Sequence, residues 1–292
     1  MVNIGIIGLG LTGSAIAKHV LEQCPDLRIV LAGAGPKSAK TGCDLGTYLG
    51  LPATGVAITS SEHLPAALRH AHPDAVIDFS RPEATLSLLR HYAAIGCGVV
   101  VGTTGFSDSQ IQRLQHAAGT GRFGLMYAPN ITRGVNVLMM LAKLATRYLP
   151  GYDIEIIERH HRRKKDSPSG TANKIAHQLH DVHGDDDART VHGREGCQPR
   201  DTGEIGVHAV RAGGIVGVHE ILFAGDHDEI TITHRSESRL AFAAGAIEAA
   251  VWVAAHRGYF TVEDMIMSEE VRSILEPALP AQTESDIIPL AV

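Results

Sequence analysis

The residues best suited to chemistry lie in segment 153–171, which reads DIEIIERHHRRKKDSPSGT. Six cationic or protonatable side chains follow one another from His160 to Lys165, so this run must lie on a surface or line a cleft. The turn at 169–171 then leads into a helix whose first backbone N–H groups lack intrahelical partners. Cationic side chains facing a helix N-terminus attract anions, because the N–H donors and the helix dipole act in the same direction. The segment therefore predicts a site for a carboxylate or a phosphate.

Two elements must hold these residues in place. Residues 153–158 alternate polar with apolar side chains and include β-branched ones, which is typical of a half-buried strand. Residues 172–176 continue the turn as a helix. A simpler interpretation is a solvated basic loop whose helix is capped by Ser169. The adjacent histidines and the tight Ser-Gly-Thr turn favour the anion site.

The N-terminal residues have the pattern of a dinucleotide-binding turn. Residues 2–7 are a short apolar run, the next six read GLGLTG, and residues 14–21 fit a helix. In this context G-x-G-x-x-G supplies a tight turn, a close approach for a pyrophosphate and close helix packing. The alternative is a turn that needs glycine only for its own geometry. The candidate cofactor contacts are Gly8, Leu9, Gly10, Leu11, Thr12 and Gly13.

The segment after the second predicted strand, residues 28–32, bears on the choice of cofactor. A fold that prefers NADH usually places Asp or Glu there, about 20 residues beyond the glycines, to bind the ribose 2′-hydroxyl. No acidic residue is present from 33 to 40, where Lys37, Ser38 and Lys40 stand instead. Because cationic side chains suit a 2′-phosphate, the sequence favours NADPH over NADH.

Further strands of the nucleotide-binding half end in polar or glycine-containing turns. Residues 74–79 and 98–101 resemble buried parallel strands, and Ser80–Glu83 matches a capping box that would open the next helix. Residues 125–130 form the last strand and its exit. Open sheets bind ligands at the carboxyl ends of their strands. The candidate cofactor contacts at these ends are Gly102, Thr103, Thr104, Ala128, Pro129, Asn130 and Ile131.

A second unit follows the Pro-Asn turn, which we interpret as the hinge. Residues 135–149 predict a long amphipathic helix, and the polar segment 184–203 predicts a long loop. Strand patterns at 205–210, 217–223 and 229–234 are separated by glycine-containing turns, which indicates a mixed or antiparallel sheet.

The chain is therefore expected to be an α/β protein, with an N-terminal Rossmann-like dinucleotide-binding domain and a second α+β domain built on a mixed sheet. The first domain spans 1–130 and is completed by a helix over 239–265. The second, for substrate binding and oligomerisation, spans 131–238. The proline-rich tail over 268–292 is expected to be disordered.

Composition narrows the class of protein. The chain has 292 residues, of which 44% are hydrophobic, and a net charge of -6 without a basic stripe, so nucleic acid is not an expected partner. No apolar run reaches the roughly 18 residues of a membrane span, and no leader is visible, so a cytoplasmic location is expected.

Cysteine and histidine spacing gives no metal prediction. Four scattered cysteines argue against a zinc ribbon and a disulfide framework. His177, His180 and His183 recur at helical spacing, but metal sites need carboxylate or thiolate partners in a closed geometry. A solvated helix face is the better interpretation.

The string E-x-x-E-x-H-H-x-x-K-x-D-x-P-S-G-T-A at 155–172 resembles the signature of the 4-hydroxy-tetrahydrodipicolinate reductase (dihydrodipicolinate reductase) family, which belongs to the diaminopimelate and lysine pathway. GTTGF at 102–106 and APNITRGVN at 128–136 resemble further family motifs. The nucleotide turn differs from the family pattern, which usually carries another glycine and an Arg-Met pair.

The resemblance implies roles for individual residues. His160 is implied as the general acid or as the group that positions the acid, and Lys164 as a proton donor near the substrate ring. The substrate contacts that it implies are His161, Ser169, Gly170 and Thr171. Arg239 is a candidate fork donor to the second carboxylate of the substrate, the alternative being a surface arginine.

The implied reaction is hydride transfer from NADPH or NADH to a cyclic dicarboxylate, 4-hydroxy-tetrahydrodipicolinate, with loss of water. The resemblance also implies a homotetramer packed through the free face of the second sheet. One alternative is a paralogue that reduces another cyclic imine or amino acid. Another is a non-catalytic NAD(P) sensor, although a sensor has no use for the proton donors His160 and Lys164.

Overall fold

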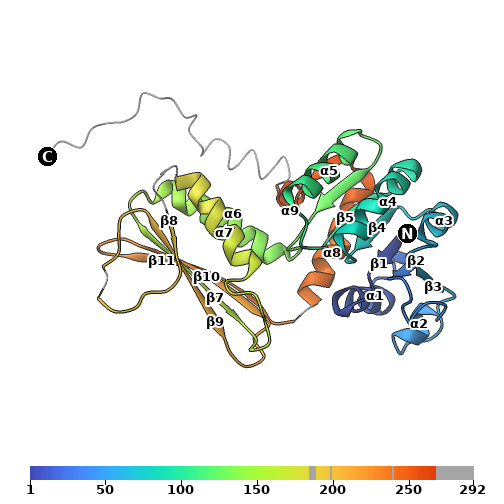
Figure 1. Ribbon diagram of the computed structural model, residues 1–292, viewed down its shortest axis with the longest axis horizontal. Coiled ribbons are helices and arrows are strands. Elements are labelled where there is room, and N and C mark those ends of the chain that lie inside the picture. The colour runs from blue at the N-terminus through green and yellow to red at the C-terminus, as the bar shows by residue number, and fades with distance from the viewer. Residues whose placement is uncertain (184–188, 198, 239, 268–292) are drawn as a thin grey trace.

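The computed structural model describes residues 1–183, 189–197, 199–238 and 240–267 (Figure 1). Within these residues the chain forms two units, each built on its own sheet. The predicted fold class is confirmed. Arg239 and the tail over 268–292 lie outside the described residues, so the predictions on them stay predictions.

The first sheet is parallel throughout and has the strand order β12-β6-β5-β4-β1-β2-β3. Helices cover both faces, so the central strands are buried along their whole length and lack polar alternation. The strands are β1 (Val2–Ile7), β2 (Leu27–Ala34), β3 (Ile58–Ser60), β4 (Ala75–Asp78), β5 (Gly98–Val101), β6 (Gly124–Tyr127) and β12 (Gly258–Phe260).

Hydrophobic cores lie on both faces of this sheet. One is closed by α8, whose small alanine side chains are fully buried against the strands. The helices of this unit are α1 (Leu11–Gln23), α2 (Leu45–Tyr48), α3 (Leu64–Ala71), α4 (Pro82–Ile95), α5 (Asp108–Gly119), α8 (Leu240–Ala255) and α9 (Val262–Ile266).

Two expectations for this unit are wrong. The segment 239–265 is not one helix, because Gly258, at a φ of 124°, turns the chain into β12, which pairs with β6. The capping box at Ser80–Glu83 does not form either. Ser80 Oγ donates to Asp78 Oδ1 at 2.6 Å, and α4 instead begins at Pro82, whose fixed φ suits a first helical position.

The second sheet is mixed, with the order β11-β10-β7-β9-β8. Strand β7 pairs antiparallel with β10 and parallel with β9. Helices α6 and α7 pack on one face over a separate hydrophobic core, and no helix of the described residues covers the other face (Figure 1). The elements are α6 (Arg133–Tyr148), β7 (Asp153–His160), α7 (Gly170–His183), β8 (Arg189–Val191), β9 (Glu204–Arg211), β10 (Gly217–Ala224) and β11 (Glu229–Ser236).

The loop predicted over 184–203 is interrupted by β8. This strand is only three residues long and forms because it adds to the edge of β9, a tertiary contact that leaves no periodic pattern. The four cysteines are free thiols. Among the described residues, no helix combines the length and the apolar character needed to cross a membrane.

Candidate active site

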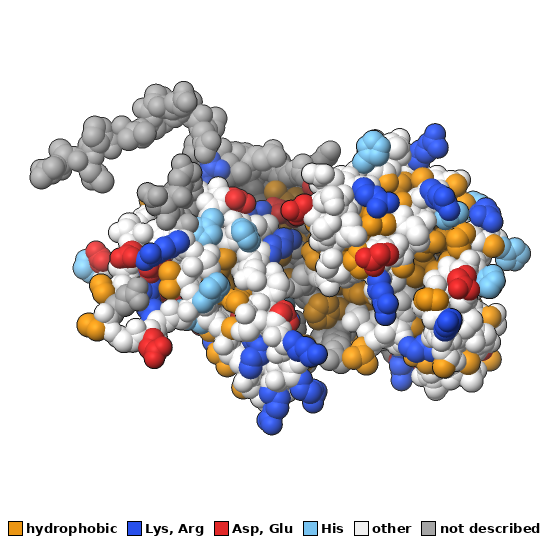
Figure 2. All heavy atoms as spheres, viewed as in Figure 1, with side chains coloured by type: hydrophobic (Ala, Val, Ile, Leu, Met, Phe, Trp, Pro, Cys, Tyr) orange, Lys and Arg blue, Asp and Glu red, His pale blue; other side chains and the backbone are white. Residues whose placement is uncertain are grey.

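A cavity of about 1180 Å³ lies between the two units. Its walls come from the first turns of α1, the exits of β5 and β6, the β7–α7 connection, and β10 and β11. Figure 2 shows Lys and Arg side chains gathered at the end of the second unit beside the gap between the two halves. The cavity therefore joins the predicted cofactor side to the predicted substrate side.

The carboxylate of Glu158 is the centre of the substrate side. It is fully buried and accepts hydrogen bonds from His160 Nδ1 at 2.6 Å and from the backbone N–H of Ser169 at 2.9 Å. Arg211 also contacts both of its oxygens, at 2.8 and 2.6 Å. The hydrogen bond at Nδ1 fixes the His160 ring and leaves Nε2 free of Glu158.

The residues around His160 also set its charge. Burial lowers the pKa of His160, and the hydrogen bond from its ring to Glu158 opposes that shift. Burial opposes ionisation of Glu158, but the donors from Arg211 and His160 hold its pKa below the ordinary value. The result is a charged carboxylate against a histidine that can take or give a proton.

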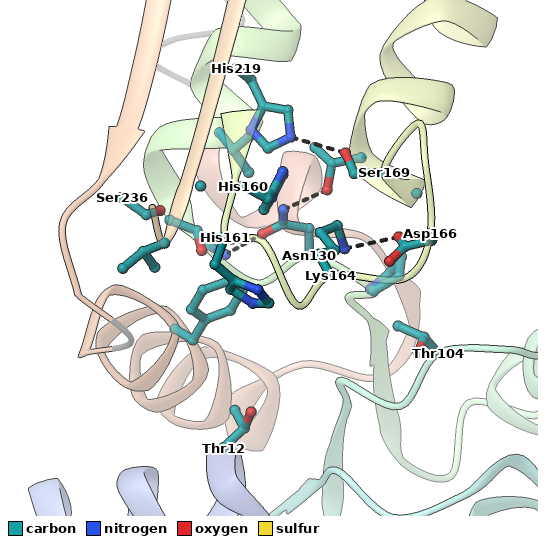
Figure 3. Close-up of a pocket in the computed structure, with 18 of the residues that line it drawn as sticks. Thr12, Thr104, Asn130, His160, His161, Lys164, Asp166, Ser169, His219 and Ser236 are labelled. Carbon is teal, nitrogen blue, oxygen red and sulfur yellow. Dashed lines mark hydrogen bonds and ion pairs between the residues drawn. The ribbon is translucent and has the colours of Figure 1, made fainter. Parts of the chain in front are cut away.

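Lys164 lines the same cavity from the loop after β7. Its ammonium group forms an ion pair with Asp166 at 2.9 Å, and its side chain is 23% exposed (Figure 3). His161 lines the cavity beside it. His160, His161 and Lys164 are therefore brought together, as predicted for one loop.

The Ser169–Thr171 turn opens α7 at the edge of the cavity. Ser169 Oγ accepts the backbone N–H of Ala172 at 3.2 Å, which caps the helix as the simpler interpretation of the sequence proposed. The side-chain amide of Asn130 donates to Thr171 Oγ1 at 2.9 Å. This hydrogen bond joins the predicted hinge at Asn130 to the predicted anion-binding turn at Ser169–Thr171.

Each glycine of the first turn has one of the three roles expected of it: the tight turn, close helix packing or room for the ligand. Gly8 has a φ of 90°, and a Cβ there would lie 2.4 Å from the Phe79 backbone. A Cβ on Gly13 would lie 2.2 Å from the carbonyl oxygen of Gly8, so this glycine permits close helix packing. A Cβ on Gly10 would meet nothing within 4 Å among the described residues. Open space at Gly10 suits the close approach of a ligand.

The predicted cofactor residues fall into two groups. Leu11, Thr12, Thr104, Pro129 and Asn130 line the cavity. The others do not line it: Thr103 Oγ1 donates to the Asp78 carbonyl at 3.3 Å, and a Cβ on Gly102 would strike the Phe79 ring. The remaining predicted residues that do not line the cavity are Gly8, Leu9, Gly10, Gly13, Ala128 and Ile131.

Several cavity residues were not predicted. His219 and His234 line it from β10 and β11, Lys174 from the first turns of α7, and Tyr127 from the end of β6. His219 is 5% exposed, and burial, followed by the nearby His160, lowers its pKa to about 4. It pairs across the sheet with Glu158, a register that cannot be read from the sequence of either strand.

Most of the chain matches one family. Residues 2–131 match the family described as "Dihydrodipicolinate reductase, N-terminus", and residues 134–266 match "Dihydrodipicolinate reductase, C-terminus". A 4-hydroxy-tetrahydrodipicolinate reductase of Methanococcoides burtonii is 38% identical over 92% of this chain and 100% of its own. The reductase of Laribacter hongkongensis is 44% identical over 82% of this chain and 88% of its own.

A solved structure agrees. Dipicolinate-bound dihydrodipicolinate reductase from Paenisporosarcina sp. TG-14 has a TM-score of 0.72 and 27% identity, over 91% of this chain and 99% of that one. The matches show that the chain belongs to the dihydrodipicolinate reductase family, and it is therefore an NAD(P)H-dependent oxidoreductase.

Proposed function

We propose that the protein reduces 4-hydroxy-tetrahydrodipicolinate to tetrahydrodipicolinate with His160 and Lys164 as proton donors. The observation that carries the proposal is the cavity itself: it holds His160, Lys164 and the Ser169–Thr171 turn on one wall, and Thr104 with Pro129 on the other. Family membership supplies the reaction and its place in the lysine and diaminopimelate pathway.

The nicotinamide supplies a hydride when it is bound. The chain must then place the substrate ring, exclude water and deliver the proton that leaves with the hydroxyl group as water. His160 is suited to this task because Glu158 holds its Nδ1 and leaves Nε2 available. Lys164 is held by Asp166 and can exchange that partner for the substrate.

Each of the two carboxylates of the substrate needs its own binding site. The first site is the start of α7, where residues 169–171 offer hydroxyl and N–H donors. His161 also lines the cavity. Arg239 is proposed for the second carboxylate. The bound dipicolinate of the Paenisporosarcina enzyme, a planar dicarboxylate, supports a seat of this kind.

We favour NADPH over NADH because of Lys40. Its ammonium group donates to the carbonyl oxygen of Leu9 in the glycine turn and lies 5.0 Å from the centre of the Tyr48 ring. A cation is thus fixed beside the nucleotide turn, with Lys37 and Ser38 on the same loop.

In Lys40→Met, the NADPH to NADH ratio of kcat/KM should fall about tenfold, because the variant lacks the cation that would contact the 2′-phosphate. An unchanged ratio would show that Lys40 does not select the cofactor.

The wider organisation is proposed on the same basis. The dinucleotide-binding domain comprises 1–130 and the elements after 239, and the substrate domain comprises 131–238. The uncovered face of the mixed sheet supports a homotetramer, and the free cysteines fit a cytoplasmic protein.

Absorbance at the nicotinamide band tests the function. Purified protein, freshly generated 4-hydroxy-tetrahydrodipicolinate and each cofactor should give substrate-dependent oxidation. His160→Ala should lower kcat by roughly 10² to 10⁴ while cofactor binding and the thermal unfolding midpoint are retained. If the native protein binds cofactor but oxidises neither NADPH nor NADH, its substrate is another cyclic imine. If His160→Ala turns over normally, His160 is not the proton donor.

A further inference from the structure

His219 shares the buried end of the cavity with Ser169, and their contact decides what kind of ligand atom Ser169 can bind. The two side chains are 5% and 2% exposed, and His219 Nε2 lies 3.3 Å from Ser169 Oγ (Figure 3). Both residues line the cavity. Either atom can be the donor in this pair, so the position of the histidine proton must be found from the other contacts.

The other ring nitrogen identifies the tautomer. Nδ1 of His219 is buried and has no hydrogen-bond partner among the described residues. The low pKa of His219 leaves the ring neutral near pH 7, with one N–H. A buried N–H without an acceptor is rarer and costlier than a buried lone pair without a donor. The proton therefore lies on Nε2 and is donated to Ser169 Oγ.

With this hydrogen bond from His219, both lone pairs of Ser169 Oγ are occupied. A hydroxyl oxygen has two lone pairs and one proton. Ser169 Oγ already accepts the N–H of Ala172 at 3.2 Å, so His219 Nε2–H takes the second lone pair. What remains is the hydroxyl proton, for which no acceptor lies within hydrogen-bond distance among the described residues.

From this geometry we infer that His219 is a positioning residue that turns Ser169 into an obligate donor toward the ligand. The group that meets Ser169 is then an acceptor, such as a carboxylate oxygen, and not a hydroxyl or an amine that needs an acceptor. The opposite tautomer would direct the Ser169 proton onto His219 and leave nothing for a carboxylate. The inference rests on the proposed function for the identity of that carboxylate.

The tautomer can be measured without any ligand. In protein labelled with ¹⁵N-histidine, two-bond ¹H–¹⁵N correlations distinguish Nε2–H from Nδ1–H, and the His219 signals are those lost in His219→Gln. The expected result at pH 7 is a neutral ring protonated at Nε2. A ring protonated at Nδ1 overturns the inference, whatever the substrate proves to be.

The effect on binding is measured by calorimetry with pyridine-2,6-dicarboxylate on protein saturated with cofactor. His219→Phe should weaken binding about tenfold, whereas His219→Gln, whose amide N–H can replace Nε2–H, should stay within about threefold of the native protein. In a Ser169→Ala background, His219→Phe should add less than about twofold, because the residue acts through Ser169.

Equal losses from His219→Phe in both backgrounds would show that His219 acts by bulk alone and would overturn the inference. Failure of the proposed function is distinguishable, because the native protein would then neither bind the dicarboxylate nor turn over, while the tautomer could still be read. If His219→Phe does not fold, the His219→Gln comparison and the tautomer keep the test decisive.

Discussion

At the scale of single residues, Glu158 organises the site although it does not line the cavity. Its carboxylate is buried and holds His160, the Ser169 backbone and both terminal nitrogens of Arg211. A glutamine would place one N–H₂ group against these donors. The geometry of His160 would then be lost even though the shape of the side chain is kept.

Glu158→Gln should therefore lower kcat by about 10- to 100-fold, because a charge-assisted hydrogen bond is worth roughly 1.5–3 kcal/mol. Since the Glu158 bond raises the pKa of His160 against burial, its loss should also move the limb of the kcat profile that reports His160 to lower pH. Stopped-flow rates from pH 5 to 9 measure both effects.

Glu220→Gln is the matched control. Glu220 lies on the neighbouring strand and pairs with Arg159, but neither residue lines the cavity. It should leave kcat and its pH profile unchanged. A normal profile for Glu158→Gln would mean that His160 needs no carboxylate partner.

At the scale of elements, the glycine turn separates folding from cofactor binding. A Cβ at Gly13 meets the Gly8 carbonyl at 2.2 Å, whereas one at Gly10 meets no described residue within 4 Å. Gly13→Ala should therefore lower the thermal unfolding midpoint by several degrees, for a cost of about 1–3 kcal/mol. Gly10→Ala should keep the midpoint and weaken cofactor binding at least about tenfold, because the methyl group occupies the space for the pyrophosphate.

Gly119→Ala at the end of α5 controls for the extra methyl group, since its Cβ also meets no described residue within 4 Å. Fluorescence titration with NADPH and a thermal melt are the two measurements. Normal NADPH affinity in Gly10→Ala would show that the pyrophosphate does not pass this glycine.

Only some of the helices and strands could be predicted from the sequence. The strands β1, β4 and β5 were predicted because strands buried on both faces are continuous runs of apolar residues. Helix α6 was predicted because its apolar residues recur with the helical period. The strands β8 and β12 were missed because each has three residues and exists only by pairing with β9 or β6. The family motif at 155–172 contains His160 and Lys164, so the sequence alone could propose them. It could not point to His219, because the position of that residue opposite Glu158 depends on the register between β10 and β7.

At the scale of the whole molecule, the uncovered face of the mixed sheet should hold copies of the chain together. Val210 on β9 is a large apolar residue whose side chain is 41% exposed. It lies on this face, because it is three residues from Val207, which packs in the core on the helix-covered face. Light scattering after size exclusion should give four times the 31.1 kDa chain mass. Val210→Arg should lower that mass.

Leu141→Arg is the control for this assembly. Leu141 is 46% exposed but lies on α6, on the covered side of the sheet. It should leave the mass unchanged. A single-chain mass for the native protein would contradict the proposed tetramer, and equal masses for Val210→Arg and the native protein would place the interface elsewhere.

The buried histidine should also make the stability of the whole fold depend on pH. His219 faces His160, Glu158, His234 and Lys164, and its folded pKa of about 4 lies below the ordinary value near 6.5. Between these two values the unfolded chain binds the proton more readily than the folded one. Stability therefore falls as the pH falls from about 6.5 toward 4, and from pH 7 to pH 5 the loss due to His219 is about 2 kcal/mol.

Replacing His219 by glutamine removes this titration, so the drop in unfolding free energy between pH 7 and pH 5 should shrink by about 2 kcal/mol relative to the native protein. Urea unfolding at the two pH values measures it, with His227→Gln, at an exposed position, as the control for losing a histidine. His160 and His234 also have lowered pKa values and remain in the variant. The native chain and the variant should therefore both weaken in acid, the variant less. An equal loss in both would mean that folding does not lower the pKa of His219, so the neutral ring at pH 7 would rest on the tautomer measurement alone.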